Sequence, residues 1–174
     1  MDRRIEKTKH SICNAFIELR SRKPLERITV KELCESAQIN KTTFYSHYVD
    51  IFDLSEQIES DVISDIIRNL HSIENVILDP AAFSHSLFLE YTAHSTLLTT
   101  IFSGSRREQL AKKTHTAIKE QLFTQFPEYA NDPEINIIIS YSVYGGNYAF
   151  IENQEYDEDT LIRTIGKISK KVVS

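Results

Sequence analysis

The stretch Ile28–Leu54, ITVKELCESAQINKTTFYSHYVDIFDL, decides the fold expected for this chain, because it contains three helix starts in succession. Thr29 and Glu32 have the spacing of a capping box, in which the hydroxyl accepts from the third backbone N–H and the carboxylate reaches back to the cap. Asn40 and Asp50 can cap a second and a third helix. An apolar residue before each cap can pack on another one five positions later, as a hydrophobic staple. The three staple pairs are Ile28 with Leu33, Ile39 with Phe44, and Val49 with Leu54.

The first two of these helices are short and close together. A helix at about Val30–Ala37 and another at about Lys41–Tyr48 leave a three-residue turn between them, which is the spacing of a helix-turn-helix. Phe44 and Tyr48 lie one turn apart and face inward against the first helix. The opposite face then carries Lys41, Thr42, Tyr45 and Ser46. Hydroxyls and a lysine can donate to phosphates or base edges, whereas an ordinary solvated face favours Glu, Lys and Gln, so we prefer a DNA-binding interpretation.

Charge is distributed unevenly along the chain, although the formal net charge is −5. Residues 1–48 contain ten basic residues (lysine or arginine) and six acidic residues. Residues 49–174 contain ten basic and 19 acidic residues. A basic N-terminal part joined to an acidic remainder indicates an anionic partner for the N-terminal part. The segment from about Arg3 to Arg20 also has the periodicity of an amphipathic helix, which would cover the helix pair. Its apolar residues are Ile5, Ile12, Ala15, Phe16 and Leu19.

Composition favours a compact helical protein in a reducing compartment. The 174 residues include only 4 Gly and 4 Pro, with 41% hydrophobic residues. We see no secretory signal and no apolar run near the roughly 20 residues of a membrane span, so the expected location is the cytoplasm. Cys13 and Cys34 have no metal-ligand spacing, and buried apolar side chains are their simplest interpretation.

The same stretch, Ile28–Leu54, resembles the DNA-binding signature of the tetracycline-repressor (TetR/AcrR) family of bacterial transcription regulators, and its T-F-Y-x-H-Y run is the most specific part. The resemblance covers roughly residues 8–56. It implies an all-α fold with an N-terminal helix-turn-helix DNA-binding domain, residues 1–50, and a helical dimerisation and ligand-binding domain, residues 51–174. It further implies a homodimeric repressor that binds a palindromic double-stranded DNA operator and is released by a small-molecule effector.

The resemblance also assigns roles to particular residues. It places Lys31 near a base or phosphate and the outward face of the second helix in the major groove. The residues implied to hold phosphates are Thr29, Thr43, Tyr45 and His47, and those in the groove are Lys41, Thr42, Tyr45 and Ser46. Arg3, Arg4, Lys7 and Lys9 would add backbone contacts or form a solvated terminus. Two positions depart from the family pattern, because Gln38 stands where glycine is usual and Ile51 where a phosphate-binding lysine is common.

Periodicity predicts further helices beyond residue 50. Their expected bounds are about Ile51–Leu70, Pro80–His94, Thr96–Phe102, Arg106–Gln125, Pro133–Ile151 and Glu158–Val172. The last two have apolar stripes that, by the resemblance, meet a second copy in a four-helix bundle; packing of both stripes within the monomer is the alternative. The stripe residues proposed for the dimer are Ile135, Ile139, Ser142, Gly146, Leu161, Ile165 and Ile168.

A ligand pocket is harder to predict. Aromatic residues with polar tips are typical of ligand sites, although each of these is individually more consistent with an ordinary core. The candidate pocket residues are Phe88, Tyr91, His94, Phe102, Tyr141, Tyr144 and Tyr148. No metal site or cofactor is expected, because His85, His94 and His115 lack metal-ligand spacing. The sequence contains no nucleophile elbow and no phosphate loop, so an enzyme is the weakest hypothesis for its function. The alternative to a ligand-binding region is one that docks a partner protein.

Overall fold

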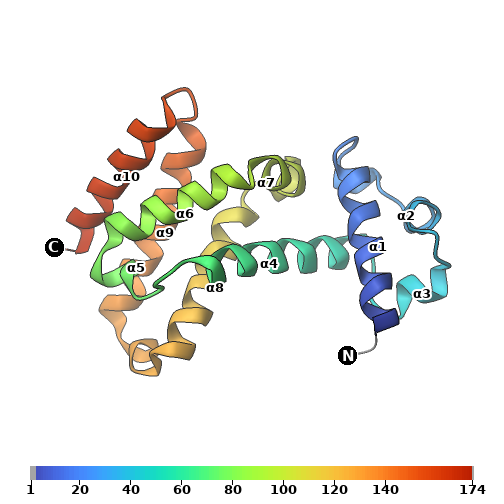
Figure 1. Ribbon diagram of the computed structural model, residues 1–174, viewed down its shortest axis with the longest axis horizontal. Helices are drawn as coiled ribbons and strands as arrows, with labels where there is room; N and C mark the ends of the chain where they lie inside the picture. The colour runs from blue at the N-terminus through green and yellow to red at the C-terminus, as the bar shows by residue number, and fades with distance from the viewer. Residues whose placement is uncertain (1–2, 174) are drawn as a thin grey trace. The chain divides into compact units, whose positions relative to one another are not determined.

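The computed structural model describes residues 3–173, and these form ten α-helices and three short 3-10 helices with no strand (Figure 1). The all-α prediction is therefore confirmed. The α-helices are α1 (Arg3–Arg20), α2 (Val30–Ala37), α3 (Lys41–Tyr45), α4 (Ile51–Asn69), α5 (Asn75–Leu78), α6 (Pro80–Ala93), α7 (Ser95–Ile101), α8 (Gln109–Gln125), α9 (Pro133–Glu152) and α10 (Glu158–Val173). The 3-10 helices are Leu25–Arg27, Gly104–Arg106 and Pro127–Asn131.

The chain divides into two compact units, and the first of them is discontinuous in sequence. Unit 1 contains the described chain up to Glu59 together with the segment Thr96–Arg107. Unit 2 contains Ser60–Ser95 and the chain from Glu108 onward. Helix α4 continues from one unit into the other, so the division does not fall in a loop. A boundary at residue 50, as expected from sequence, takes no account of the separate segment of unit 1.

The core of unit 1 is formed by apolar side chains from the first four helices, and α1 packs against α2. Phe16 of α1, Leu33 of α2, Phe44 of α3 and Leu54 of α4 are completely buried. The predicted cover from α1 is confirmed for four of its five apolar positions. The exception is Ile5, which is 42% exposed.

The three cap residues predicted for α2, α3 and α4 each accept a hydrogen bond from a backbone N–H. Thr29 Oγ1 accepts from the N–H of Glu32 at 3.3 Å, and Asn40 Oδ1 accepts from the N–H of Thr43 at 2.8 Å. At α4 the cap is reciprocal: the carboxylate of Asp50 accepts from the N–H of Asp53, and the carboxylate of Asp53 accepts from the N–H of Val49, both at 2.8 Å. These bonds satisfy amides that lack a partner within the helix, which fixes where each helix begins.

Two details of the predicted caps differ in the structure. The carboxylate of Glu32 accepts from the Lys23 ammonium at 2.5 Å, so it is used to anchor the loop before α2. Val49 is 78% exposed, so its predicted staple with the fully buried Leu54 is wrong. The reciprocal Asp50–Asp53 cap already holds the entry of the chain into α4, and Val49 is left on the surface.

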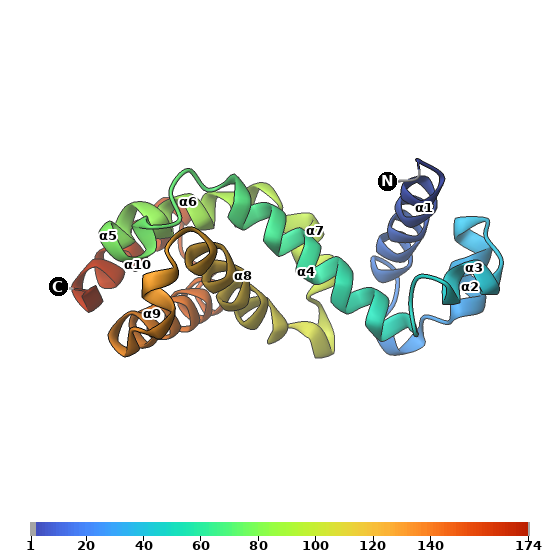
Figure 2. The same ribbon diagram turned by 90° about the horizontal axis from the view of Figure 1, so that it is seen from below.

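Unit 2 is a helical assembly in which α10 packs along α6 and α9, and α8 packs against α9 (Figures 1 and 2). Its core contains a stacked pair of rings, Phe88 of α6 and Phe150 of α9, with centroids 4.5 Å apart. A Cβ placed on Gly146 would lie 3.5 Å from the Phe88 ring, which is an ordinary van der Waals contact. Asp79 and Asp132 cap α6 and α9, each followed by proline, as predicted.

Helix ends in unit 2 and its neighbouring segment agree with the sequence less well. Helix α8 begins at Gln109 instead of about Arg106, because the residues before it form the 3-10 turn Gly104–Arg106. The short helix α5 was not expected at all. Over the described residues, no helix combines the length and the apolar character that crossing a membrane requires.

Candidate nucleic-acid interface

The turn between α2 and α3 is built around Gln38, which adopts the left-handed conformation with φ 55° and ψ 43°. Within residues 3–173 it is the sole non-glycine residue with positive φ. Its N–H donates to the carbonyls of Cys34 and Glu35, and the N–H of Ile39 donates to Cys34 O at 3.0 Å. These bonds terminate α2 in the way that glycine usually does. The strain of a side chain here, of order 1 kcal/mol, is therefore tolerated and the turn keeps its geometry.

The face of α3 opposite its core residue is polar and open. Phe44 is fully buried, whereas Tyr45 is 57% exposed. The Tyr45 ring meets the Phe44 ring edge-on, with centroids 5.4 Å apart, and this contact restrains a side chain that solvent otherwise surrounds. The other exposed residues of this face are Lys41, Thr42 and Ser46. The inward and outward assignment made from the sequence is confirmed for these positions.

The remaining predicted DNA contacts also belong to unit 1. Thr29 and Lys31 are exposed, and Thr43 and His47 are half-buried. The ammonium of Lys31 lies 3.9 Å from the Glu35 carboxylate, an exposed pair of little energetic weight. Lysine at this position therefore keeps its donors available to an anion.

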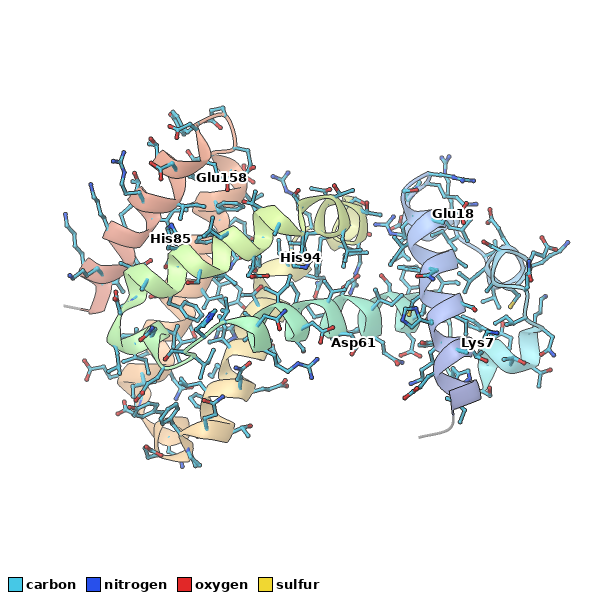
Figure 3. The ribbon with its side chains drawn as sticks, in the orientation of Figure 1. Lys7, Glu18, Asp61, His85, His94 and Glu158 are labelled. Atoms are coloured by element: carbon cyan, nitrogen blue, oxygen red, sulfur yellow. The ribbon has the colours of Figure 1, made fainter. Side chains whose placement is uncertain are left out.

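The start of α1 carries the basic residues predicted to add backbone contacts. Lys7 is exposed near the first turns of the helix, far along it from Glu18 (Figure 3). Lys9 is half-buried. The side chains of Arg3 and Arg4 lie outside the described residues, so their predicted contacts stay predictions.

The beginning of α4 lacks the positive charge that a lysine at position 51 would offer to a phosphate. Ile51 is only 5% exposed and belongs to the core, so it contributes no charge. Hydrogen bonds from the N–H of Val49 and from Gln57 lower the pKa of the Asp53 carboxyl. Asp50 and Asp53 place two carboxylates at this helix start, and they already occupy N–H groups that an anion would need. The exposed side chain of Phe52 beside them was missed by the sequence analysis.

The predicted aromatic pocket does not form as one site. Phe88 and Tyr91 are buried in the core of unit 2, whereas Tyr141 and Tyr148 are 65% and 49% exposed. Phe102 belongs to unit 1. The remaining two each pair with a neighbour in unit 2. The Nδ1 of His94 lies 2.9 Å from the Glu90 carbonyl, and the Tyr144 ring lies 5.2 Å from that of His115.

A buried polar network lies at the centre of unit 2. The Tyr91 hydroxyl hydrogen-bonds with Thr114 Oγ1 and donates to Asn147 Oδ1 at 3.1 Å. Burial raises the pKa of Tyr91, and the bonds to Thr114 and Asn147 oppose this only in part. Asn147 Nδ2 donates in turn to Val143 O at 2.9 Å. Tyr91 is thus a neutral, satisfied core group.

Beside this network is a small, partly open pocket of about 20 Å³, lined by polar and apolar side chains. Ser84 and Ser169 hydrogen-bond to each other there at 3.2 Å, and Ser142 Oγ is buried without a partner among the described residues. This space suits one water molecule, whereas drug-sized ligands occupy roughly 300 to 1,000 Å³. Serines spaced along helices gave no sequence signal for it. The lining is Val76, Pro80, Phe83, Ser84, Leu87, Phe88, Ser142, Val143, Gly146, Asn147 and Ser169.

The residues predicted to form a dimer interface are divided between core and surface. Ile139, Leu161 and Ile165 are buried within unit 2, and Ile168 is 55% exposed. The other three, Ile135, Ser142 and Gly146, are half-buried. The exposed apolar residues of α9 are instead Ile137, Tyr141 and Tyr148. Because α9 is apolar on all sides, its sequence does not reveal which stripe faces the core.

Comparison with protein-family models, with curated proteins and with solved structures finds no match to the chain. Over residues 3–173, no group of three or more His, Cys, Asp or Glu side chains is placed to hold a metal ion.

Proposed function

We propose that the chain is a sequence-specific DNA-binding transcription regulator, in which α2 and α3 form a helix-turn-helix and α3 enters the major groove. The observation that carries the proposal is the face of α3, where Lys41, Thr42, Tyr45 and Ser46 are exposed opposite a fully buried Phe44. Hydroxyls and a lysine on a short helix suit base edges and phosphates.

The proposal includes a homodimer. Two reading helices must lie about 34 to 36 Å apart to enter successive major grooves, so a palindromic operator requires a second copy. The exposed apolar residues Ile137, Tyr141 and Tyr148 of α9 are the surface that supports such a contact. Large exposed apolar side chains on one helix face are typical of protein interfaces.

In the proposed mechanism a small-molecule effector releases the repressor from its operator. An effector acts only through its different affinities for the DNA-bound and released conformations. The small pocket of unit 2 has room for about one water molecule, so a ligand at this place requires α6 and α10 to separate. The second candidate, a regulator whose unit 2 docks a partner protein, is favoured by the same exposed residues of α9.

The test of DNA binding uses fragments of the region upstream of the protein's own gene, at two salt concentrations and against random DNA of equal length. Specific and steeply salt-dependent binding is expected. Tyr45→Ala should weaken specific binding by about 1 to 3 kcal/mol. The matched control is Tyr156→Ala, which removes a tyrosine of similar exposure, 59%, from unit 2. Equal affinities of the two folded variants would show that α3 does not read DNA through this face.

A further inference from the structure

Arg20, near the end of α1, is a buried cation whose hydrogen bonds go to neutral oxygens. Only 4% of it is exposed. Its guanidinium donates to Lys23 O at 3.1 Å, to Ile101 O at 3.4 Å, and to Ser103 at 3.3 Å (carbonyl) and 2.6 Å (Oγ). Burial lowers the pKa of Arg20, and the carboxylates of Glu26 and Glu59 oppose this. The acceptors of Ile101 and Ser103 lie at the end of α7, where helix carbonyls favour a cation.

The turn that follows α7 makes two further polar contacts within unit 1. Arg106 donates to both carboxylate oxygens of Glu59, at 2.8 and 2.6 Å, and Glu59 also accepts from Ser55 Oγ at 2.7 Å. Ser105 donates to the carboxylate of Glu26, and this bond lowers the pKa of that carboxyl. The segment Ile101–Arg106 is therefore fastened to α1, to α4 and to the loop before α2.

The contacts of Arg20 continue toward the start of α2. Lys23, whose carbonyl accepts from Arg20, donates through its ammonium to Glu32 in the first turn of α2. Thr29 caps the same turn. A continuous series of bonds thus joins Ser103 at the end of α7 to the helix start that carries the candidate phosphate contact Thr29.

We propose that Arg20 is a positioning residue. Its hydrogen bonds to Ile101 and Ser103 fix the loop before α2 and therefore the start of that helix. A guanidinium suits this role because its planar fork reaches several acceptors at once, whereas an ammonium is a single point of charge. The segment Ile101–Ser103 lies between α6 and α8 in the chain, and both of those helices belong to unit 2. The consequence for DNA affinity rests on the proposed function, while the fixing of α2 does not.

The experiment compares Arg20→Lys with Arg22→Lys in the full chain. Both changes keep the charge, but Arg22 is exposed and pairs with Glu18 on its own helix at 2.7 Å. Amide hydrogen exchange is measured at Glu32 and Leu33, whose N–H groups donate to Thr29, with the amides of α8 as an internal reference. Arg20→Lys should speed exchange at the start of α2 by about tenfold, the effect of losing one charged hydrogen bond. The α8 amides should not change.

A second pair of variants distinguishes a local effect at the start of α2 from a general loss of stability. Ser103→Ala removes the 2.6 Å bond to Arg20, whereas Ser21→Ala removes a bond to Glu18 O within the α1 end. Ser103→Ala should reproduce the local faster exchange, and Ser21→Ala should not. Unchanged exchange at Glu32 and Leu33 in both Arg20→Lys and Ser103→Ala would overturn the positioning role, as would equal acceleration in α8.

DNA affinity separates this inference from the proposed function. Where the wild-type chain binds specific DNA, Arg20→Lys should raise the dissociation constant about tenfold per active molecule, and Arg22→Lys by less than about twofold. Equal dissociation constants for the two variants would overturn the inference and leave the proposed function intact. Absence of specific DNA binding by the wild type would refute the proposed function, and hydrogen exchange alone would then decide the positioning role.

Discussion

The two units bury polar groups in different ways. Unit 1 buries charges, namely Arg20 and the Glu59–Arg106 pair, and it also contains the left-handed Gln38. Unit 2 buries neutral groups, with Tyr91 bonded to Thr114 and Asn147.

A buried charge that loses its partner is far more costly than a neutral group that does so, so charged contacts penalise alternative arrangements more strongly. We therefore expect the orientation of segments to be more strictly specified in unit 1, where three segments distant in sequence meet. Four changes test it, in order of decreasing expected effect.

The largest effect is expected from Arg106→Met, which leaves the fully buried Glu59 without its cation. Breaking a buried pair from one side should lower the free energy of unfolding by about 3 to 5 kcal/mol. Urea denaturation measures the loss, and Arg107→Met, which removes the same charge at the exposed neighbouring position, is the control. A small and similar loss of unfolding free energy in both variants would mean that the Glu59–Arg106 pair does not specify the arrangement of unit 1.

Tyr91→Phe probes the neutral network of unit 2. It removes one hydroxyl and leaves Thr114 and Asn147 each without one bond, so the free energy of unfolding should fall by about 1 to 3 kcal/mol. The same denaturation experiment measures it, with the exposed Tyr148→Phe as control. A loss larger than that of Arg106→Met would reverse the comparison between the units.

Gln38→Gly should relieve the strain in unit 1. Glycine removes a left-handed penalty of about 1 to 2 kcal/mol but adds about 0.4 to 1 kcal/mol of unfolded-chain entropy, so a net gain of about 0.5 kcal/mol is expected. Ser36→Gly, within α2, should instead destabilise by up to about 1 kcal/mol. Thermal denaturation of the two variants compares them, and a destabilised Gln38→Gly would show that the side chain makes a favourable contact.

The smallest effect concerns the exposed contact between Ser105 and Glu26. This bond lowers the pKa of the Glu26 carboxyl, so its stabilisation is present above the unfolded-state pKa and is lost as the pH falls through the lower folded-state pKa. Ser105→Ala should raise the Glu26 pKa toward its ordinary value and reduce this acid sensitivity. Carboxyl NMR titration measures the change, with Glu18 as an exposed reference. An unaltered Glu26 pKa would contradict the assignment.

The caps show how much of the fold could be predicted from the sequence. Thr29, Asn40 and Asp50 each bind an amide three residues later, so the bounds of helix starts follow from local spacing alone. The polar face of α3 was predictable for the same reason, since Phe44 determines which side is buried. Local rules fail where a helix is apolar all round, as α9 is, because several stripes compete for the core.

Sequence by itself determined the all-helical fold, the helix starts of unit 1 and the outward face of α3, because these depend on residues within about one helical turn of each other. Only the tertiary structure decided that Thr96–Arg107 belongs with unit 1, that Arg20 donates to the carbonyl of Ser103, and that Arg106 donates to the carboxylate of Glu59. It likewise placed Ile139 in the core and Ile137 on the surface. Such pairings join residues up to 83 positions apart, and no local spacing encodes them.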